Sequence, residues 1–172
     1  LGRDQTKTLK FCEEMSSELG LPVNLAKDHM DLYECSIICT ATTSHKPVLF
    51  GKNLRPGTHI NSIGANRMER QELDDEVIPK CSFVTVDNKA QAQKESSLLN
   101  RAIKDVRSTF CWDDVLELSD CIKSESQLHR PASAITLYNS HGVAMEDVAL
   151  ATKAVDLAKE RGIGSFVEFT SF

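Results

Sequence analysis

Three short polar segments follow apolar runs of strand length and carry groups that could bind a ligand. They are residues 40–44, 61–66 and 139–142. Their threonine, serine and asparagine side chains offer hydroxyl and amide groups, and the glycines in two of them leave room near the backbone. In open α/β sheets, ligands bind beyond the carboxyl ends of the strands. The segments are therefore candidate binding loops, although polar residues follow strands in most proteins and the pattern alone identifies no ligand.

Ser140, His141 and Gly142 also precede a predicted helix over residues 142–161. Two interpretations of this segment are open. The free backbone N–H groups at a helix start favour an anion, such as a phosphate. Alternatively, the Ser140 hydroxyl accepts one of these N–H groups as an ordinary helix cap.

Several other reaction classes lack their residues in this sequence. The five histidines show no metal-ligand spacing, so no metal site is expected. No Gly-x-Ser-x-Gly segment marks a nucleophilic serine, and the phosphate-binding loop G-x-G-x-x-G is absent. Gly162 and Gly164 follow a predicted helix and are interpreted as its carboxyl-terminal cap. His59 lies beside an apolar run and is expected to support the core rather than to react.

The elements that would position these loops alternate along the chain. Continuous apolar runs are typical of strands buried on both faces of a parallel sheet. They predict strands over residues 36–41, 58–64, 82–87 and 134–138. Helical spacing predicts helices over residues 5–19, 88–107, 112–122 and 142–161. Asp4 is expected to cap the first helix and Gly20 to end it. The alternation predicts an α/β domain with a mostly parallel sheet.

Charge and composition argue against several classes of partner. With 20 Lys and Arg against 25 Asp and Glu, the formal net charge is −5, which disfavours binding to nucleic acid or to an anionic membrane. No apolar run approaches the ~20 residues of a membrane helix, and no signal peptide is recognisable. The 172 residues suit one domain, and six cysteines without paired spacing suit reduced thiols. A cytoplasmic protein is expected.

Taken together, these motifs resemble the ornithine cyclodeaminase/mu-crystallin family in the right order over nearly the whole chain. The matching segments are residues 37–44, 47–49, 54–66, 72–74, 86–95 and 140–147, and the Pro-Gly-x-His-Ile-Asn segment at 56–61 is the most specific. The resemblance implies an α/β, Rossmann-like doubly wound parallel sheet that lacks its first strand and glycine-rich loop. It implies a partial NAD(P)-binding Rossmann domain over residues 1–138. Residues 139–172 would form a helix and strand returning toward an absent substrate and dimerisation domain.

The chemistry implied by this resemblance moves a hydride between a nicotinamide and a carbon that bears nitrogen. The leading expectation is an NAD(P)H-dependent enzyme that reduces a cyclic imine (ketimine) amino acid, or a related amino-acid dehydrogenase. The alternatives are ornithine cyclodeaminase, which forms proline and ammonia, and a non-catalytic mu-crystallin-like protein that binds NADPH and thyroid hormone. A small-molecule imine or amino acid is the expected substrate, and the intact protein is expected to be a homodimer.

The resemblance also assigns expected roles to individual residues. Gly2, Arg3 and Asp4 would meet the adenosine ribose or its phosphate, and Arg3 favours NADP(H), with NAD(H) as the alternative. Those expected along the rest of the cofactor are Thr40, Ala41, Thr42, Ile63, Ser140 and Gly142, the last three at the nicotinamide end.

One position departs from the cyclodeaminase pattern. Cyclodeaminases have an acidic residue two positions after the glycine that follows the His-Ile-Asn segment, whereas this chain has Asn66. An amide cannot take up a proton as a carboxylate does. Asn66 is therefore predicted to orient a substrate by hydrogen bonds, and reduction of a preformed imine is favoured over ornithine cyclisation.

The first residue is Leu1 rather than methionine, and members of the family are considerably longer. The sequence is therefore interpreted as partial. The 172-residue chain alone is expected neither to bind a dinucleotide tightly nor to catalyse a reaction.

Overall fold

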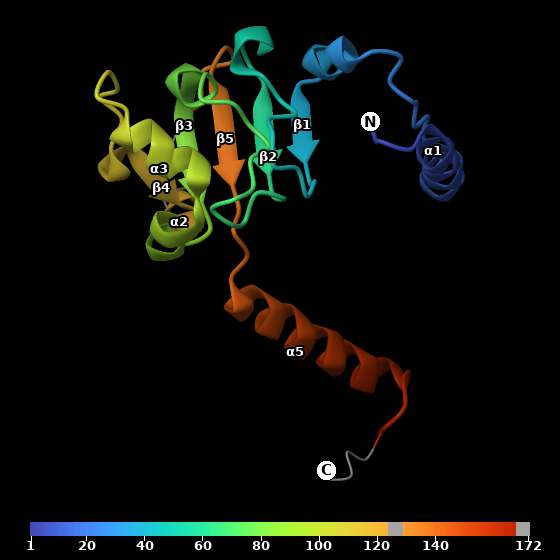
Figure 1. Cartoon of the computed structure of the whole chain (residues 1–172). Helices are drawn as coiled ribbons and strands as arrows, with labels where there is room; N and C mark the ends of the chain where they lie inside the picture. The colour runs from blue at the N-terminus through green and yellow to red at the C-terminus, as the bar shows by residue number, and fades with distance from the viewer. Residues whose placement is uncertain (124–128, 168–172) are drawn as a thin grey trace.

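The computed structural model describes residues 1–123 and 129–167, and within these residues a single parallel sheet organises the chain (Figure 1). The five strands of this sheet are β1 (Ile37–Thr40), β2 (His59–Ser62), β3 (Cys81–Val86), β4 (Val115–Glu117) and β5 (Ile135–Asn139). Their order across the sheet is β1-β2-β5-β3-β4, and every neighbouring pair is parallel. The prediction of an α/β domain with a mostly parallel sheet is confirmed.

The described α-helices lie before, between and after these strands in the chain. The α-helices are α1 (Gln5–Leu19), α2 (Lys89–Glu95), α3 (Ser97–Lys104), α4 (Leu118–Lys123) and α5 (Ala144–Arg161). Short 3-10 helices lie at His29–Glu34, Gly51–Asn53, Ile78–Lys80 and Trp112–Asp114. Asp4 caps α1 by accepting from the Lys7 backbone N–H at 3.1 Å, and Gly20 ends it with φ of 63°, as the sequence predicts.

The hydrophobic core lies on one face of the sheet. One residue from each strand forms a continuous row across this face, and all five are buried: Ile38, Ile60, Leu137, Val84 and Val115. Helix α3 covers the row with Leu98, Leu99 and Ala102. Burial of each such side chain contributes roughly 1.5–3 kcal/mol to folding, so this row stabilises the observed register of the strands.

Helix α4 belongs to the opposite face, where its Cys121 lies 3.8 Å from Thr85 Oγ1 of β3. Helices therefore lie on both faces, as a doubly wound sheet requires. The prediction that the first strand is buried on both faces is wrong for β1, because Ile37 is 62% exposed and Cys39 is also exposed. Alternate residues of a strand point to opposite faces, and only Ile38 and Thr40 of β1 face the core.

The predicted helix over residues 112–122 is correct only for its last part, where α4 lies. A 3-10 turn, the strand β4 and the helix α4 share this segment, and Val115 joins the core row. A strand of three residues is too short to show alternation, so helical spacing fits the same sequence. The predicted helix over residues 88–107 divides at Ser96, whose hydroxyl accepts from the Leu99 backbone N–H at 3.2 Å and caps α3.

Helices α1 and α5 stand away from the sheet (Figure 1). Helix α5 begins at Ala144, and Gly162 ends it with φ of 63°, so the predicted cap at Gly162 is confirmed. The strand expected after this helix, over residues 166–169, falls partly outside the described residues; its described part, Phe166 and Val167, forms no strand. Among the described residues, no helix is both long and apolar enough to cross a membrane.

Candidate nucleotide site at the carboxyl ends of the strands

A second row of residues crosses the sheet two positions beyond the core row, at the carboxyl ends of the strands. Register places Thr40, Ser62, Asn139, Val86 and Glu117 side by side. Three of these are polar and buried, namely Thr40, Ser62 and Asn139. Each of the three predicted binding loops contains one of these residues at its first or second position, so the fold does bring the loops to one edge of the sheet.

The carboxylate of Glu72 joins the ends of β1 and β2. It is 1% exposed and accepts from Thr40 Oγ1 at 2.9 Å, from Ser62 Oγ at 3.3 Å and from the Gly64 backbone N–H at 2.9 Å. Its other oxygen accepts from the backbone N–H of Thr42. The loops after β1 and β2 are therefore fixed to each other through one buried side chain.

Gly64 is required by the close approach of these two loops. A Cβ atom at this position would overlap the backbone nitrogen and oxygen of Thr42 and would press on the Glu72 carboxylate. Only glycine lets the loop after β2 pass this closely over the loop after β1.

The carboxylate of Asp87 joins the ends of β3 and β5 in the same way. Its Oδ2 accepts from Ser140 Oγ at 3.1 Å and from the backbone N–H groups of His141 at 2.9 Å and Gly142 at 2.7 Å. Its Oδ1 accepts from the backbone N–H of Asn88 at 3.1 Å. The side chain of Asp87 is 1% exposed.

Burial on its own raises the pKa of Asp87, but its hydrogen-bonding partners outweigh that effect and hold the pKa well below its usual range. The groups that lower the pKa are the nearby side chain of His141 and the backbone N–H groups of His141, Gly142 and Asn88, which donate hydrogen bonds to the carboxylate. The His141 imidazole is fully buried, and its Nδ1 lies 3.7 Å from Asp87 Oδ1, too far for a good hydrogen bond. The imidazole therefore lowers the pKa of the carboxyl group as a nearby polar group rather than through a good hydrogen bond.

This arrangement decides between the two interpretations of residues 140–142. Helix α5 begins at Ala144 after Val143, so the prediction that Ser140 caps it is wrong. The N–H groups of His141 and Gly142 do hold an anion, but it is the chain's own Asp87. A phosphate would find no free N–H group at these two residues.

Gly142 has φ of 75°, a conformation that glycine adopts without strain, and a Cβ atom there would meet nothing within 4 Å. The space beside this residue is therefore open, in contrast to that beside Gly64. Its carbonyl oxygen accepts from Gln91 Nε2 at 2.8 Å, which ties the loop to α2 as well.

Asn66 and Ile63 lie in the loop after β2, beside the Glu72 cluster. Asn66 is half-buried, and its Oδ1 accepts from Arg70 Nη1 at 3.2 Å. Ile63 is 48% exposed, and its backbone N–H donates to the Thr40 carbonyl at 2.9 Å. Ala41 and Thr42 are exposed in the neighbouring loop.

Gly2, Arg3 and Asp4 are exposed at the start of α1 and are not brought to the carboxyl-end row. The sequence-based selection of residues also missed Glu72 and Asp87. Both lie in the motifs that resemble the family, but nothing in their local sequence shows that they are buried and accept hydrogen bonds from distant loops.

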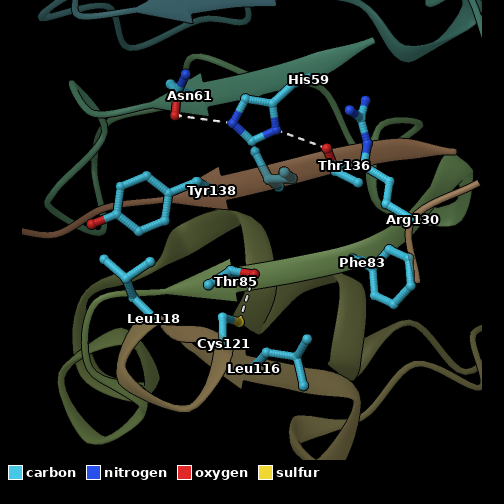
Figure 2. Close-up of a pocket in the computed structure, with 11 residues that line it drawn as sticks. His59, Asn61, Phe83, Thr85, Leu116, Leu118, Cys121, Arg130, Thr136 and Tyr138 are labelled. Atoms are coloured by element: carbon cyan, nitrogen blue, oxygen red, sulfur yellow. Dashed lines mark hydrogen bonds between the residues drawn. The ribbon is translucent and has the colours of Figure 1, made fainter. Parts of the chain in front are cut away.

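A cavity of about 340 Å³ lies on the other face of the sheet, between β2, β5, β3 and α4 (Figure 2). His59 spans part of it, with Nδ1 2.7 Å from Thr136 Oγ1 and Nε2 3.2 Å from Asn61 Oδ1 (Figure 2). Burial raises the pKa of Tyr138, which also lines the cavity. Both ring nitrogens of His59 are engaged, so this histidine has no free atom to act as a base. Within the described residues, no group of three or more His, Cys, Asp or Glu side chains could hold a metal ion.

Known proteins share both the sequence pattern and the fold. The model of the ornithine cyclodeaminase/mu-crystallin family matches residues 1–162. A Δ1-pyrroline-2-carboxylate reductase of Bacillus cereus is 30% identical over 169 residues, covering 97% of this chain and 51% of the relative. The ketimine reductase mu-crystallin of Macropus fuliginosus is 37% identical over 121 residues, covering 69% of this chain and 34% of that protein.

A solved structure extends the likeness to three dimensions. Thermococcus litoralis Δ1-pyrroline-2-carboxylate reductase in complex with NADH and L-proline superimposes with a TM-score of 0.84 at 30% identity. The match covers 96% of this chain and 51% of that one. The chain spans about half the length of these reductases.

Proposed function

The chain belongs to the ornithine cyclodeaminase/mu-crystallin family, and from this premise we propose that it acts in the NAD(P)H-dependent reduction of a cyclic imine amino acid. The observation that carries the proposal is the likeness, over 96% of the chain, to a reductase that binds NADH and L-proline. The relatives named Δ1-pyrroline-2-carboxylate reductase and ketimine reductase support the same reaction class.

The residues at the carboxyl ends of the strands suit the nicotinamide end of such a cofactor. Thr40, Thr42 and Ser140 offer hydroxyl groups, and the open space beside Gly142 leaves room for a ring. Glu72 and Asp87 already accept the nearby backbone N–H groups, which suits a neutral group better than a pyrophosphate. Ala41 and Ile63 would add apolar contacts. When bound, a dihydronicotinamide supplies the hydride.

Asn66 favours imine reduction over the cyclodeaminase reaction. Its amide oxygen is already engaged by Arg70, and an amide cannot take a proton from a substrate amine or water. The side chain can therefore orient a preformed imine but cannot act as the base that ornithine cyclisation needs.

The adenosine end is proposed to involve Gly2, Arg3 and Asp4. A guanidinium at Arg3 suits a 2′-phosphate, so NADP(H) is the preferred cofactor and NAD(H) the alternative. Asp4 is occupied as the cap of α1, which leaves Arg3 as the group that would face a phosphate. Residues 1–138 would form the cofactor-binding part, and residues 139–172 would lead toward a substrate and dimerisation part of a cytoplasmic homodimer.

The test is substrate-dependent oxidation of NADPH and NADH by the natural full-length protein. We expect turnover with 1-pyrroline-2-carboxylate or 1-piperideine-2-carboxylate. Formation of proline and ammonia from ornithine would establish the cyclodeaminase instead. Tight NADPH binding without turnover of any ketimine or amino acid would contradict the proposal and support a binding protein of the mu-crystallin type.

A further inference from the structure

Resting on the proposed function, we propose that Asp87 is a positioning residue that orients the hydroxyl of Ser140. In this orientation Ser140 accepts a hydrogen bond from the carboxamide N–H of a bound nicotinamide. The role belongs to Asp87 because its carboxylate accepts the one hydrogen bond that the Ser140 hydroxyl can donate.

The geometry around Asp87 Oδ2 assigns the direction of each hydrogen bond. An ionised carboxylate can only accept, so Ser140 Oγ, at 3.1 Å, must donate to it. A hydroxyl has one hydrogen, and once it is committed the remaining lone pairs can only accept. Ser140 is half-buried and lies at the carboxyl end of β5, in the position proposed for the nicotinamide end of the cofactor.

The carboxylate stays ionised across the neutral pH range. His141 and the N–H groups of Gly142 and Asn88 keep the pKa of Asp87 low despite its burial. The same carboxylate holds the backbone of residues 140–142 through two charge-assisted hydrogen bonds, at 2.9 Å and 2.7 Å. The acceptor direction of Ser140 is therefore built into the folded chain before any ligand binds.

This arrangement favours a neutral hydrogen-bond donor over an anion. Asp87 satisfies the N–H groups that would otherwise attract a phosphate, and its negative charge lies directly behind Ser140. A carboxamide offers two N–H donors and no charge. A ligand group of the same shape without an N–H group would lose the hydrogen bond to Ser140.

The test compares the binding of NADH with that of its reduced 3-acetylpyridine analogue, in which a methyl ketone replaces the carboxamide. Dissociation constants are measured by isothermal titration on the natural full-length protein. We expect the wild type to prefer NADH by roughly three- to tenfold, the worth of one hydrogen bond between neutral groups. Ser140→Ala and Asp87→Ala should each remove that preference.

The double variant, with alanine at both Asp87 and Ser140, tests whether Asp87 acts through Ser140 or contributes to the NADH preference independently. If Asp87 acts through Ser140, the double variant shows no further loss of the NADH preference beyond either single variant. Asp87→Asn, whose amide oxygen can still accept from Ser140, should recover part of the NADH preference. This variant also keeps the proposal testable if the alanine variant fails to fold. Asp113→Asn, at an exposed carboxylate, should leave it unchanged.

An unchanged preference in Asp87→Ala, or losses that add in the double variant, would overturn the positioning role while leaving the proposed function intact. Failure of the wild type to bind NADH or NADPH at all would instead overturn the proposed function, and this inference with it.

Discussion

Two buried carboxylates, Glu72 and Asp87, fix the loops of the candidate site. Each accepts hydrogen bonds from side-chain hydroxyls and backbone N–H groups of loops that are distant in sequence. A buried donor left without an acceptor destabilises the fold. The loops therefore depend on these carboxylates to keep their conformation. At the scale of single residues, the site is therefore most sensitive at two positions that need not touch a ligand.

Replacing Glu72 by Gln tests this dependence. An amide must turn its NH2 group either toward the Thr42 N–H or toward the donors of Thr40, Ser62 and Gly64. We expect a loss of about 2 kcal/mol in the free energy of unfolding, measured from the urea midpoint. Glu69→Gln, at an exposed side chain earlier in the same loop, should cost less than ~0.5 kcal/mol. Equal effects of the two changes would contradict the role of Glu72.

Asp87 should make the free energy of unfolding depend on pH. Its pKa is lower in the folded chain than the ~3.9 of an unfolded Asp, so its contribution is fully present above that value. The contribution is lost as the pH falls further, through the folded pKa. Asp87→Asn should therefore be less stable than the wild type at pH 7, by about 2 kcal/mol, and the gap should narrow at pH 3. Urea titrations at the two pH values measure the gap, and a gap that stays constant would be the contrary result.

At the scale of elements, the sequence predicts what local patterns determine. The strands β1, β2, β3 and β5 and the helices α1 and α5 follow from apolar runs, helical spacing and the caps Asp4, Gly20 and Gly162. Strand β4 could not be predicted because Val115 is placed by pairing with Val84, not by its own neighbours. The interpretation of Ser140 as a helix cap is wrong for the same reason: the acceptor of its hydroxyl, Asp87, is 53 residues away. The three candidate loops do follow neighbouring strands, as the sequence predicts, but the residues that fix these loops were not predicted.

The two glycines of the candidate loops should respond differently to the same substitution. Gly64→Ala places a methyl group against the Thr42 backbone, with an expected cost of about 3 kcal/mol. In Gly142→Ala the methyl group enters open space, so the only expected cost is the backbone strain of a positive φ, roughly 1 kcal/mol of stability. Gly20→Ala has the same open surroundings and a φ of 63°, so it serves as the matched control for Gly142. Urea midpoints measure all three, and a Gly64 variant as stable as the Gly20 variant would contradict the close approach.

At the scale of the whole molecule, the described residues would form one part of the proposed dinucleotide site. They offer hydroxyls and open space at the strand ends, but Glu72 and Asp87 occupy the loop N–H groups that could hold phosphates. Arg3 lies apart from this row, at the start of α1 (Figure 1). A bound dinucleotide would have to reach both places.

We expect the isolated 172-residue chain to bind NADPH weakly. Under the proposed function, its strand-end loops would contact one end of the cofactor only, and much of a ligand's affinity depends on simultaneous contacts. Isothermal titration should show no binding in the micromolar range. A micromolar dissociation constant would show that the described residues suffice.

Arg3→Asp should shift the preference between cofactors in the natural full-length protein. The change removes a guanidinium that suits a 2′-phosphate and adds a carboxylate that suits the ribose 2′-OH. We expect the ratio of the dissociation constants for NADPH and NADH to move toward NADH by roughly tenfold or more, the worth of a charge-assisted hydrogen bond. An unchanged ratio would exclude Arg3 as the phosphate ligand.

The central position of β5 has a consequence for how the chain is made. On a ribosome, β1 with β2 and β3 with β4 emerge as separate parallel pairs, and each is too small to be stable alone. Of the five described strands, the one that joins these pairs is the last to emerge, and His59 precedes its partner Thr136 by 77 residues. Until then the apolar row of Ile60 and Val84 has no neighbour between its halves, which exposes the nascent chain to aggregation. A stop codon shortly before residue 135 would therefore remove the middle of the sheet rather than trim its end.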